Sequence, residues 1–147
     1  MKIYKPLIKL LSLIMFSSFL QSCHLNSYEA GTFLIKVDSI HVPDPIVSNT
    51  PFDIDFFGTI AGDGCHRFEY FQNSIIDNEI SIEAWGYFDN RAGACPTVMV
   101  YLDGQKLSVT VPSPGIYTII INQPDNTSLV KQITVGKATS AKNKIMQ

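Results

Sequence analysis

Charged residues are scarce in this chain of 147 residues, since Asp, Glu, Lys and Arg together make up 16% of it. The 11 basic side chains face 13 acidic ones, which gives a formal net charge of -2. So little charge argues against a disordered chain, and the lack of a basic excess argues against nucleic-acid binding. With 46% hydrophobic residues, the chain has enough apolar side chains for the core of one domain.

Familiar catalytic motifs are missing as well. The sequence has no G-x-S-x-G or H-E-x-x-H pattern, and no Gly-Lys loop of the kind that cradles a phosphate. His41 and His66 both stand at the ends of predicted strands, where a histidine is ordinarily structural. We therefore predict no catalytic residue and no cofactor, and we expect that the protein is not an enzyme.

The first 22 residues have the pattern of an export signal. Lys2, Lys5 and Lys9 provide its positive charge, and residues 10–20 form a short apolar stretch. This stretch is shorter than the ~20 residues that span a bilayer and contains serines, which disfavours an uncleaved anchor helix. A plain secretory signal is the other alternative.

The stretch ends in Leu20-Gln21-Ser22-Cys23, which resembles the lipobox of bacterial lipoproteins. The resemblance implies a signal peptide over 1–22 and a lipidated Cys23, acylated with chains such as palmitate. More than one acyl chain gives durable attachment to a membrane. Because His24–Ser27 carry no acidic cluster, we expect a periplasm-facing protein of the bacterial cell envelope, held through its lipid alone.

Loss of the signal leaves Cys65 and Cys95 as the two remaining cysteines. Outside the reducing cytosol such a pair is expected to form a disulfide. Closing the loop between them would stabilise the fold by roughly 3 to 4 kcal/mol. The alternatives, a redox pair or metal ligands, lack a C-x-x-C motif and suitably spaced histidines. We therefore predict a structural disulfide and no metal site.

The remaining chain alternates apolar and polar residues in short runs separated by Gly, Pro, Asn and Asp, a pattern typical of an all-β fold. Asp103-Gly104 between two such runs indicates a tight hairpin. We expect a lipidated tether over 23–32, one β domain over 33–136 and a frayed tail over 137–147. Strands are predicted at 33–42, 52–60, 65–71, 79–88, 97–102, 105–111, 115–122 and 128–135.

Seven or eight short strands suit a two-sheet antiparallel sandwich of the immunoglobulin-like type. Residues 112–121, with Pro114-Gly115-Ile116-Tyr117, resemble the strand entry of many secreted bacterial immunoglobulin-like domains, which implies a buried Tyr117 at a sheet corner. Cys65, Trp85 and Cys95 are placed too centrally for an antibody-type core disulfide. A jelly roll or a small barrel is the alternative architecture.

Asp53 and Asp55 lie on the same side of a predicted strand. Such a pair could bind calcium, and Asp63 could join it from the next loop. Since no third carboxylate is arranged locally to complete a site, we interpret the pair as a solvated edge.

A candidate ligand surface comes from strand parity. Trp85 and Tyr87 share one face of the strand predicted at 79–88, opposite its aliphatic face. A register with Arg67 opposite Glu83 and Cys65 beside Trp85 would add a cation to the two rings. This register predicts an exposed platform of Arg67, Trp85 and Tyr87 for a sugar ring or a protein partner.

The same register turns Tyr70 toward the core. We favour the other interpretation, in which Gly86 marks a bulge that shifts the parity of the strand and turns Trp85 into the core, as in most sandwich domains. From these features we favour a lipid-anchored, non-catalytic envelope module that binds or assembles with a protein or glycan. A small envelope hydrolase or inhibitor with unrecognised functional loops is the other hypothesis.

Overall fold

The computed structural model describes residues 29–91 and 93–137, and this part of the chain is all-β. No helix in these residues is long and apolar enough to cross a membrane. The strands are β1 (Ala30–Leu34), β2 (Ser39–His41), β3 (Ile46–Val47), β4 (Phe52–Phe57), β5 (Thr59–Ala61), β6 (His66–Ile76), β7 (Glu79–Asp89), β8 (Val100–Tyr101), β9 (Gln105–Val109), β10 (Gly115–Asn122) and β11 (Ser128–Gly136).

Most of the longer strands lie close to their predicted positions, whereas β6, predicted at 65–71, continues to Ile76. β10 matches its predicted range, and β7 and β11 extend theirs by one residue. Gly104 has a φ of 88°, as the predicted turn before β9 requires. The strand predicted at 33–42 is divided into β1 and β2, because the chain leaves one sheet and joins another between them.

The main sheet is mixed and strongly curled, and its strands follow the order β1-β7-β10-β11-β3. β1 and β10 pair with different parts of β7, at residues 85–89 and 79–82, and β6 also pairs with β7. β7 runs parallel to β10, and β11 runs parallel to β3. The prediction of purely antiparallel pairing is therefore wrong, and the fold is not a clear two-sheet sandwich. Two smaller sheets, β2-β4-β9 and β5-β8, complete the domain.

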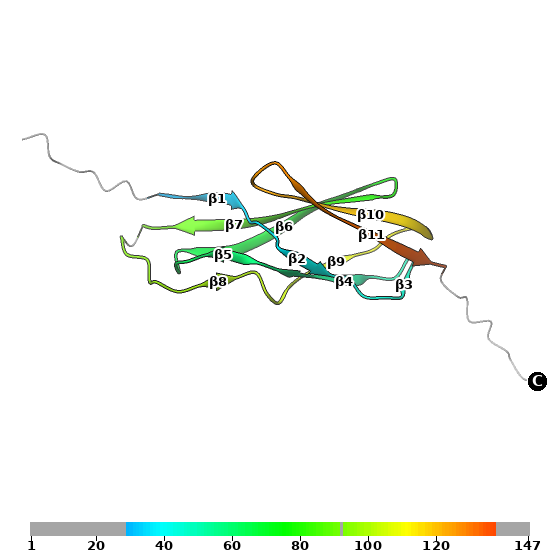
Figure 1. Ribbon diagram of the computed structural model, residues 1–147, viewed down its shortest axis with the longest axis horizontal. Helices are drawn as coiled ribbons and strands as arrows, with labels where there is room; N and C mark the ends of the chain where they lie inside the picture. The colour runs from blue at the N-terminus through cyan, green and yellow to red at the C-terminus, as the bar shows by residue number, and fades with distance from the viewer. Residues whose placement is uncertain (1–28, 92, 138–147) are drawn as a thin grey trace, which may run out of the picture.

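One hydrophobic core lies between the main sheet and the smaller sheets, which form the upper and lower parts of the view in Figure 1. The main sheet contributes Ile82 and Ile119, and β4 contributes Ile54 and Phe56 from the other side. None of these four side chains has exposed surface. Alternation of buried and exposed residues along both layers explains why the sequence pattern indicated strands.

Tyr117 is buried, as the Pro-Gly-x-Tyr resemblance implies. Its hydroxyl donates a hydrogen bond to the backbone carbonyl of Ser113, at 3.0 Å. The buried side chain is thereby satisfied where the chain turns into β10.

Gln123 is a buried polar residue that joins two distant parts of the chain. Its Nε2 donates to the carbonyl of Val37 at 2.9 Å, and its Oε1 accepts from the N–H of Val37 at 3.0 Å. The side chain thus replaces a strand partner for the segment between β1 and β2, where backbone groups would otherwise be buried without hydrogen bonds.

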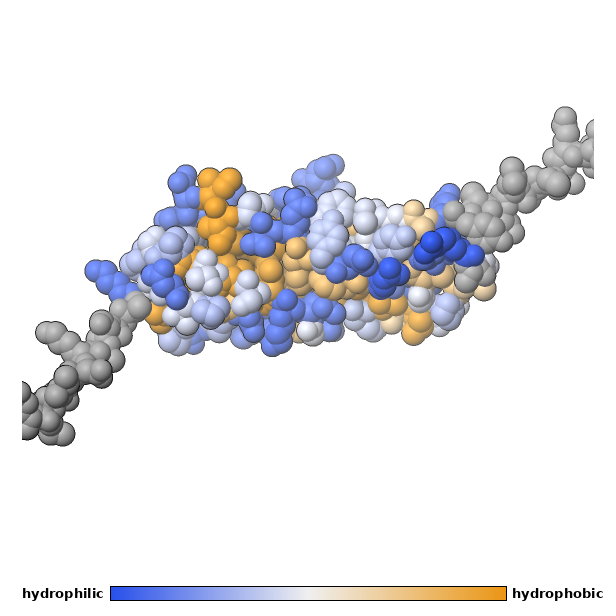
Figure 2. Space-filling view, turned by 180° about the vertical axis from the view of Figure 1, so that it is seen from behind, coloured by the Kyte–Doolittle hydropathy of each residue, from blue (hydrophilic) through white to orange (hydrophobic). Residues whose placement is uncertain are grey.

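Surface hydrophobic residues are spread over the domain. Ile76, Ile116 and Val130 are each about 60 to 70% exposed and lie on different strands. Figure 2 shows hydrophobic residues beside strongly hydrophilic ones along the face opposite to that of Figure 1. Since scattered apolar exposure is ordinary for soluble domains, exposure alone marks no binding site here.

Candidate functional site

Two aromatic residues of β7, Trp85 and Tyr87, lie on the outer face of the main sheet. Along this strand Ile80, Ile82 and Ala84 are buried, whereas Trp85 and Tyr87 alternate with them and keep part of their surface exposed. The parity predicted for β7 is therefore present in the structure. Trp85 does not belong to the buried core between the sheets, so the favoured interpretation of a core tryptophan is wrong.

Gly86 does not mark a bulge. The space that its Cβ would occupy is filled by the ring of Phe33 from β1 on the inner face, so a side chain at this position would overlap that ring. The bulge is instead in β6, where Phe68 lies opposite Gly86 and Tyr70 lies opposite Trp85, which leaves Glu69 as the extra residue.

The predicted register of β6 against β7 is wrong, because β6 continues to Ile76 and the turn into β7 lies at residues 77–78. Arg67 lies opposite Tyr87 rather than Glu83, and Cys65 lies at the far end of β7, where its carbonyl accepts a hydrogen bond from the N–H of Asp89. Tyr70, predicted to face the core, is instead 43% exposed and lies beside Trp85. One inserted residue reverses the facing of the chain that follows it, because side chains alternate with a period of two.

The outer faces of β6 and β7 together carry a row of Arg67, Tyr70, Trp85 and Tyr87, which we name the aromatic strip. The Arg67 guanidinium carbon lies 4.5 Å from the centre of the Tyr87 ring. The Tyr70 and Trp85 rings are stacked with centroids 6.4 Å apart and planes inclined by 19°. The strip therefore combines one stacked pair of aromatic rings with one cation–π pair on the same face of the sheet.

Polar side chains fix the orientation of these groups. The Trp85 indole Nε1 donates to Glu83 at 3.1 Å, and the other oxygen of Glu83 accepts from Asn122 of β10 at 3.2 Å. Arg67 Nε lies 3.3 Å from a Glu69 carboxylate oxygen. The bulged residue thus holds the cation over Tyr87, and Glu83 holds the indole.

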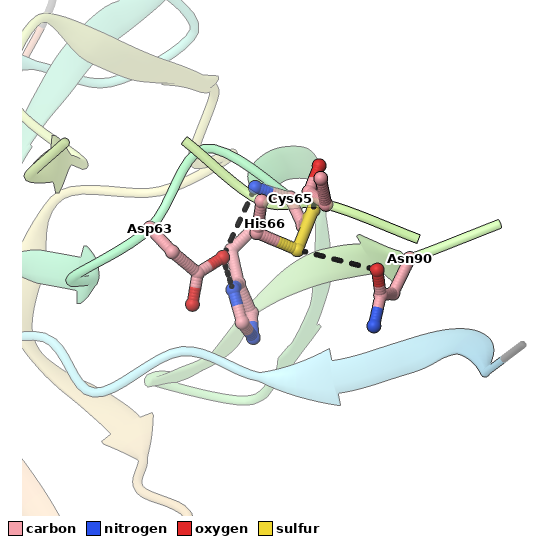
Figure 3. A network of polar contacts seen from close by, with 6 residues as sticks. Asp63, Cys65, His66 and Asn90 are labelled. Atoms are coloured by element: carbon pink, nitrogen blue, oxygen red, sulfur yellow. Dashed lines mark hydrogen bonds and ion pairs between the residues drawn. A yellow bond between two sulfur atoms is a disulfide. The ribbon is translucent and has the colours of Figure 1, made fainter. Parts of the chain in front are cut away.

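The Cys65–Cys95 disulfide is present, as the sequence predicts. It ties the loop after β7 to the start of β6, next to the aromatic strip. In Figure 3 the Asp63 carboxylate points toward Cys65 and the His66 ring. It accepts hydrogen bonds from the N–H of Cys65 at 3.0 Å and from His66 Nδ1 at 2.8 Å. The hydrogen bond from His66 holds the pKa of Asp63 below its ordinary value.

His66 itself lies between two aromatic rings. Its centroid is 4.6 Å from that of Phe88 and 5.3 Å from that of Phe33. Through its hydrogen bond to Asp63 and its ring contacts with Phe88 and Phe33, His66 connects the loop before β6 to β7 and β1. The contacts agree with the structural role expected for His66.

Two of the three carboxylates considered for calcium, Asp55 and Asp63, have separate partners. Asp55 forms an ion pair with Lys106 of β9 at 2.9 Å, and Asp63 is bound to Cys65 and His66. Within the described residues, the one group with metal-ligand atoms close together is Asp63, Cys65 and Cys95. Its two sulfur atoms are joined in the disulfide and are not thiolate ligands.

Ser128-Leu129-Val130-Lys131 fits the spacing of an S-x-x-K motif, which we did not identify from the sequence. The four residues lie in β11. Positions three apart in a strand face opposite sides of the sheet, so the hydroxyl and the amine point away from each other. This arrangement does not form a nucleophile and base pair.

A second basic residue, Arg91, lies near Arg67 but outside the aromatic strip. Arg91 Nε donates to the Asp89 carboxylate at 2.8 Å, and the hydrogen bonds from Arg91 lower the pKa of Asp89 to about 2. Arg67, Asp89 and Arg91 line a surface hollow of about 590 Å³ together with Gly64, Cys65, Ala94 and Pro96.

The site predicted from the sequence is brought together in part. Arg67, Trp85 and Tyr87 share one face, while the register that joined them was wrong. The sequence did not indicate that Tyr70 belongs to the strip, or that Glu83 and Asn122 hold Trp85 in place. The predicted lipidation site, Cys23, lies outside the residues that the structure describes.

Comparison with known protein families, curated proteins and solved structures finds no match to this chain.

Proposed function

We propose that the domain is a non-catalytic binding module of the bacterial cell envelope, anchored by lipid on Cys23, that recognises a protein or glycan partner through the aromatic strip. The observation that carries this proposal is the joint placement of Arg67, Tyr70, Trp85 and Tyr87 on the outer face of one sheet. Partner recognition concentrates on such aromatic and arginine side chains.

The strip suits recognition because its groups are already oriented. Hydrogen bonds to Glu83 and the ion pair to Glu69 restrict Trp85 and Arg67 before a partner arrives. Less conformational entropy is then lost on binding. An aromatic face with adjacent polar groups fits the apolar side of a sugar ring and also fits an apolar protein side chain.

The envelope location rests on the lipobox resemblance at Cys23, and the Cys65–Cys95 disulfide agrees with an oxidising compartment. The hydrogen bond from Tyr117 to the Ser113 carbonyl resembles the tyrosine corner of immunoglobulin-like domains. It supports that finer fold class, from which the parallel pairing of β7 and β10 departs.

The recognition surface is tested by Trp85→Ala in the full-length protein, used to capture partners from an envelope fraction and on a glycan array. Tyr101→Ala is the matched control, since Tyr101 is an aromatic residue 54% exposed on β8, outside the strip. We expect Trp85→Ala to weaken capture at least tenfold and Tyr101→Ala to leave it unchanged.

Equal capture by both variants would show that the aromatic strip is not the recognition surface. Turnover of an envelope substrate by the wild-type protein would contradict the non-catalytic proposal. A partner found on the array identifies a glycan, and one found only in the envelope fraction by cross-linking identifies a protein.

The anchor is tested by Cys23→Ser. This change should move the protein from the detergent-soluble membrane fraction to the soluble fraction. A variant that still sediments with membranes after a high-salt wash would contradict lipid attachment at Cys23.

A further inference from the structure

The outer edge of β6 is unusual among the sheet edges of this domain. β6 pairs with β7 along one side, and in the described part of the chain no strand pairs with its other side. Residues 70–76, Tyr-Phe-Gln-Asn-Ser-Ile-Ile, contain no charge, proline or glycine. Such a segment offers backbone N–H and C=O groups to another strand.

Two other edges, those of β3 and β9, carry the usual protection against such pairing. β3 has two residues, and β9 carries Lys106, which is paired with Asp55. In β6 the bulge and the Arg67–Glu69 ion pair both precede Tyr70. Short length, charge and bulges are the features that keep sheet edges apart, and residues 70–76 have none of them.

We propose that two copies of this chain pair through residues 70–76 of β6, antiparallel, about a two-fold axis at Asn73. The pairing joins the two main sheets into one continuous sheet. It is an isologous contact, in which the same segment of each copy forms both sides.

The segment is complementary to itself in this register. Tyr70 lies opposite Ile76 of the partner subunit, and Gln72 lies opposite Ser74 of the partner subunit. Tyr70 is 43% exposed and Ile76 is 69% exposed in the single chain, and each covers the other on the outer face. Aromatic residues opposite β-branched residues are favourable cross-strand pairs.

The inner face matches in the same way. Phe71 and Ile75 are partly buried and pack against the core, and Phe71 lies 4.3 Å from Phe56 between ring centroids. The proposed register sets Phe71 opposite Ile75 of the partner subunit, which extends the apolar core across the interface. A shift of two residues either way would place Tyr70 opposite Ser74 or Ile76 opposite Gln72, and would lose these matches.

The pairing adds a property to the proposed function, on which this step rests. A two-fold axis perpendicular to the sheet keeps the outer faces of both copies on one side. The two aromatic strips then face the same way, with the two Tyr70 residues about 20 Å apart along the strands at ~3.4 Å per residue. A repeating partner could engage both strips at once, which raises the overall affinity.

Cysteine cross-linking tests the axis. Asn73→Cys in the full-length chain places two thiols opposite each other, within the Cα separation that a disulfide spans. Ser108→Cys is the matched control, an exposed polar residue on the edge strand β9. After mild oxidation we expect a covalent dimer from Asn73→Cys and a monomer from Ser108→Cys, and equal yields from both would contradict the proposal.

Sedimentation tests the association without a cross-link. The wild-type chain should show a concentration-dependent dimer, and Asn73→Lys should shift it to monomer because two like charges meet at the axis. At concentrations where both chains are monomeric, their melting temperatures should be equal. Trp85→Ala should weaken partner capture and leave the dimer intact, so failure of the strip and failure of the edge pairing are distinguished. A wild-type monomer up to about 1 mM, or a dimer that Asn73→Lys does not weaken, would overturn the proposal.

Discussion

The inner and outer faces of β7 differ in burial although their residues alternate along one strand. Ile80 and Ile82 have no exposed surface, whereas Glu83, Trp85 and Tyr87 keep part of theirs. The inner side chains contact the opposite layer of the domain, and the outer ones contact their neighbours on the same sheet. One strand can therefore stabilise the fold through one face and leave the other face available for a partner.

The largest change in the free energy of unfolding is expected when one side chain on each face of β7 is truncated in turn. Ile82→Ala should lower the free energy of unfolding by about 4 kcal/mol, because it leaves a cavity in the core. Trp85→Ala should lower it by about 1 kcal/mol, because the indole lies outside the core. Denaturant unfolding measures both values, and an equal cost for the two variants would abolish the distinction between the faces.

The disulfide beside the strip gives the next largest effect. Replacing both Cys65 and Cys95 with Ser should reduce the free energy of unfolding by about 3 kcal/mol, because the unfolded chain regains the entropy of an open loop. Since neither cysteine belongs to the strip, the folded double variant should still capture the partner. Unfolding curves that coincide with those of the wild-type protein would show that the bond does not form.

Gly86 tests the contact between the inner face of β7 and β1. Gly86→Ala should cost about 2 kcal/mol, because the added methyl group overlaps the Phe33 ring. A double variant with Phe33→Leu should recover part of this loss, which a double-mutant cycle would measure as coupling. Additive costs in the cycle would mean that the two residues do not meet.

The smallest effect is on the pH dependence of stability, through the ion pair of Asp89 and Arg91 near the strip. Arg91 lowers the pKa of Asp89 to about 2, so this pair favours the folded state above the ordinary pKa of an aspartate. The contribution is lost as the pH falls from about 4 toward about 2. NMR titration should find Asp89 at about 2 in the wild-type protein and closer to 4 in Arg91→Gln. An ordinary pKa for Asp89 beside an intact Arg91 would contradict this pair.

Local sequence patterns predicted much of the fold. The alternation in residues 79–88 and 115–122 indicated β7 and β10, and Asp103-Gly104 indicated the turn before β9, because each signal depends on neighbouring residues. The disulfide followed from having only two cysteines beyond the predicted lipidation site. The same local reasoning placed Trp85 and Tyr87 on one face.

Long-range relations were beyond these patterns. The parallel pairing of β7 with β10, and the hydrogen bonds of Gln123 to Val37, join residues far apart in the sequence. The bulge at Glu69 has no glycine to mark it, yet it decides that Tyr70 joins the strip and that Arg67 faces Tyr87. Strand register depends on packing across the sheet, and composition does not encode it directly.

The central claim, that the outer face of β7 is a recognition surface, is tested most directly by the fluorescence of Trp85, the single tryptophan of the chain. We expect that acrylamide quenches Trp85 in the native protein and that a bound partner protects it. A blue-shifted emission that acrylamide does not quench would place the indole in the core and contradict the account.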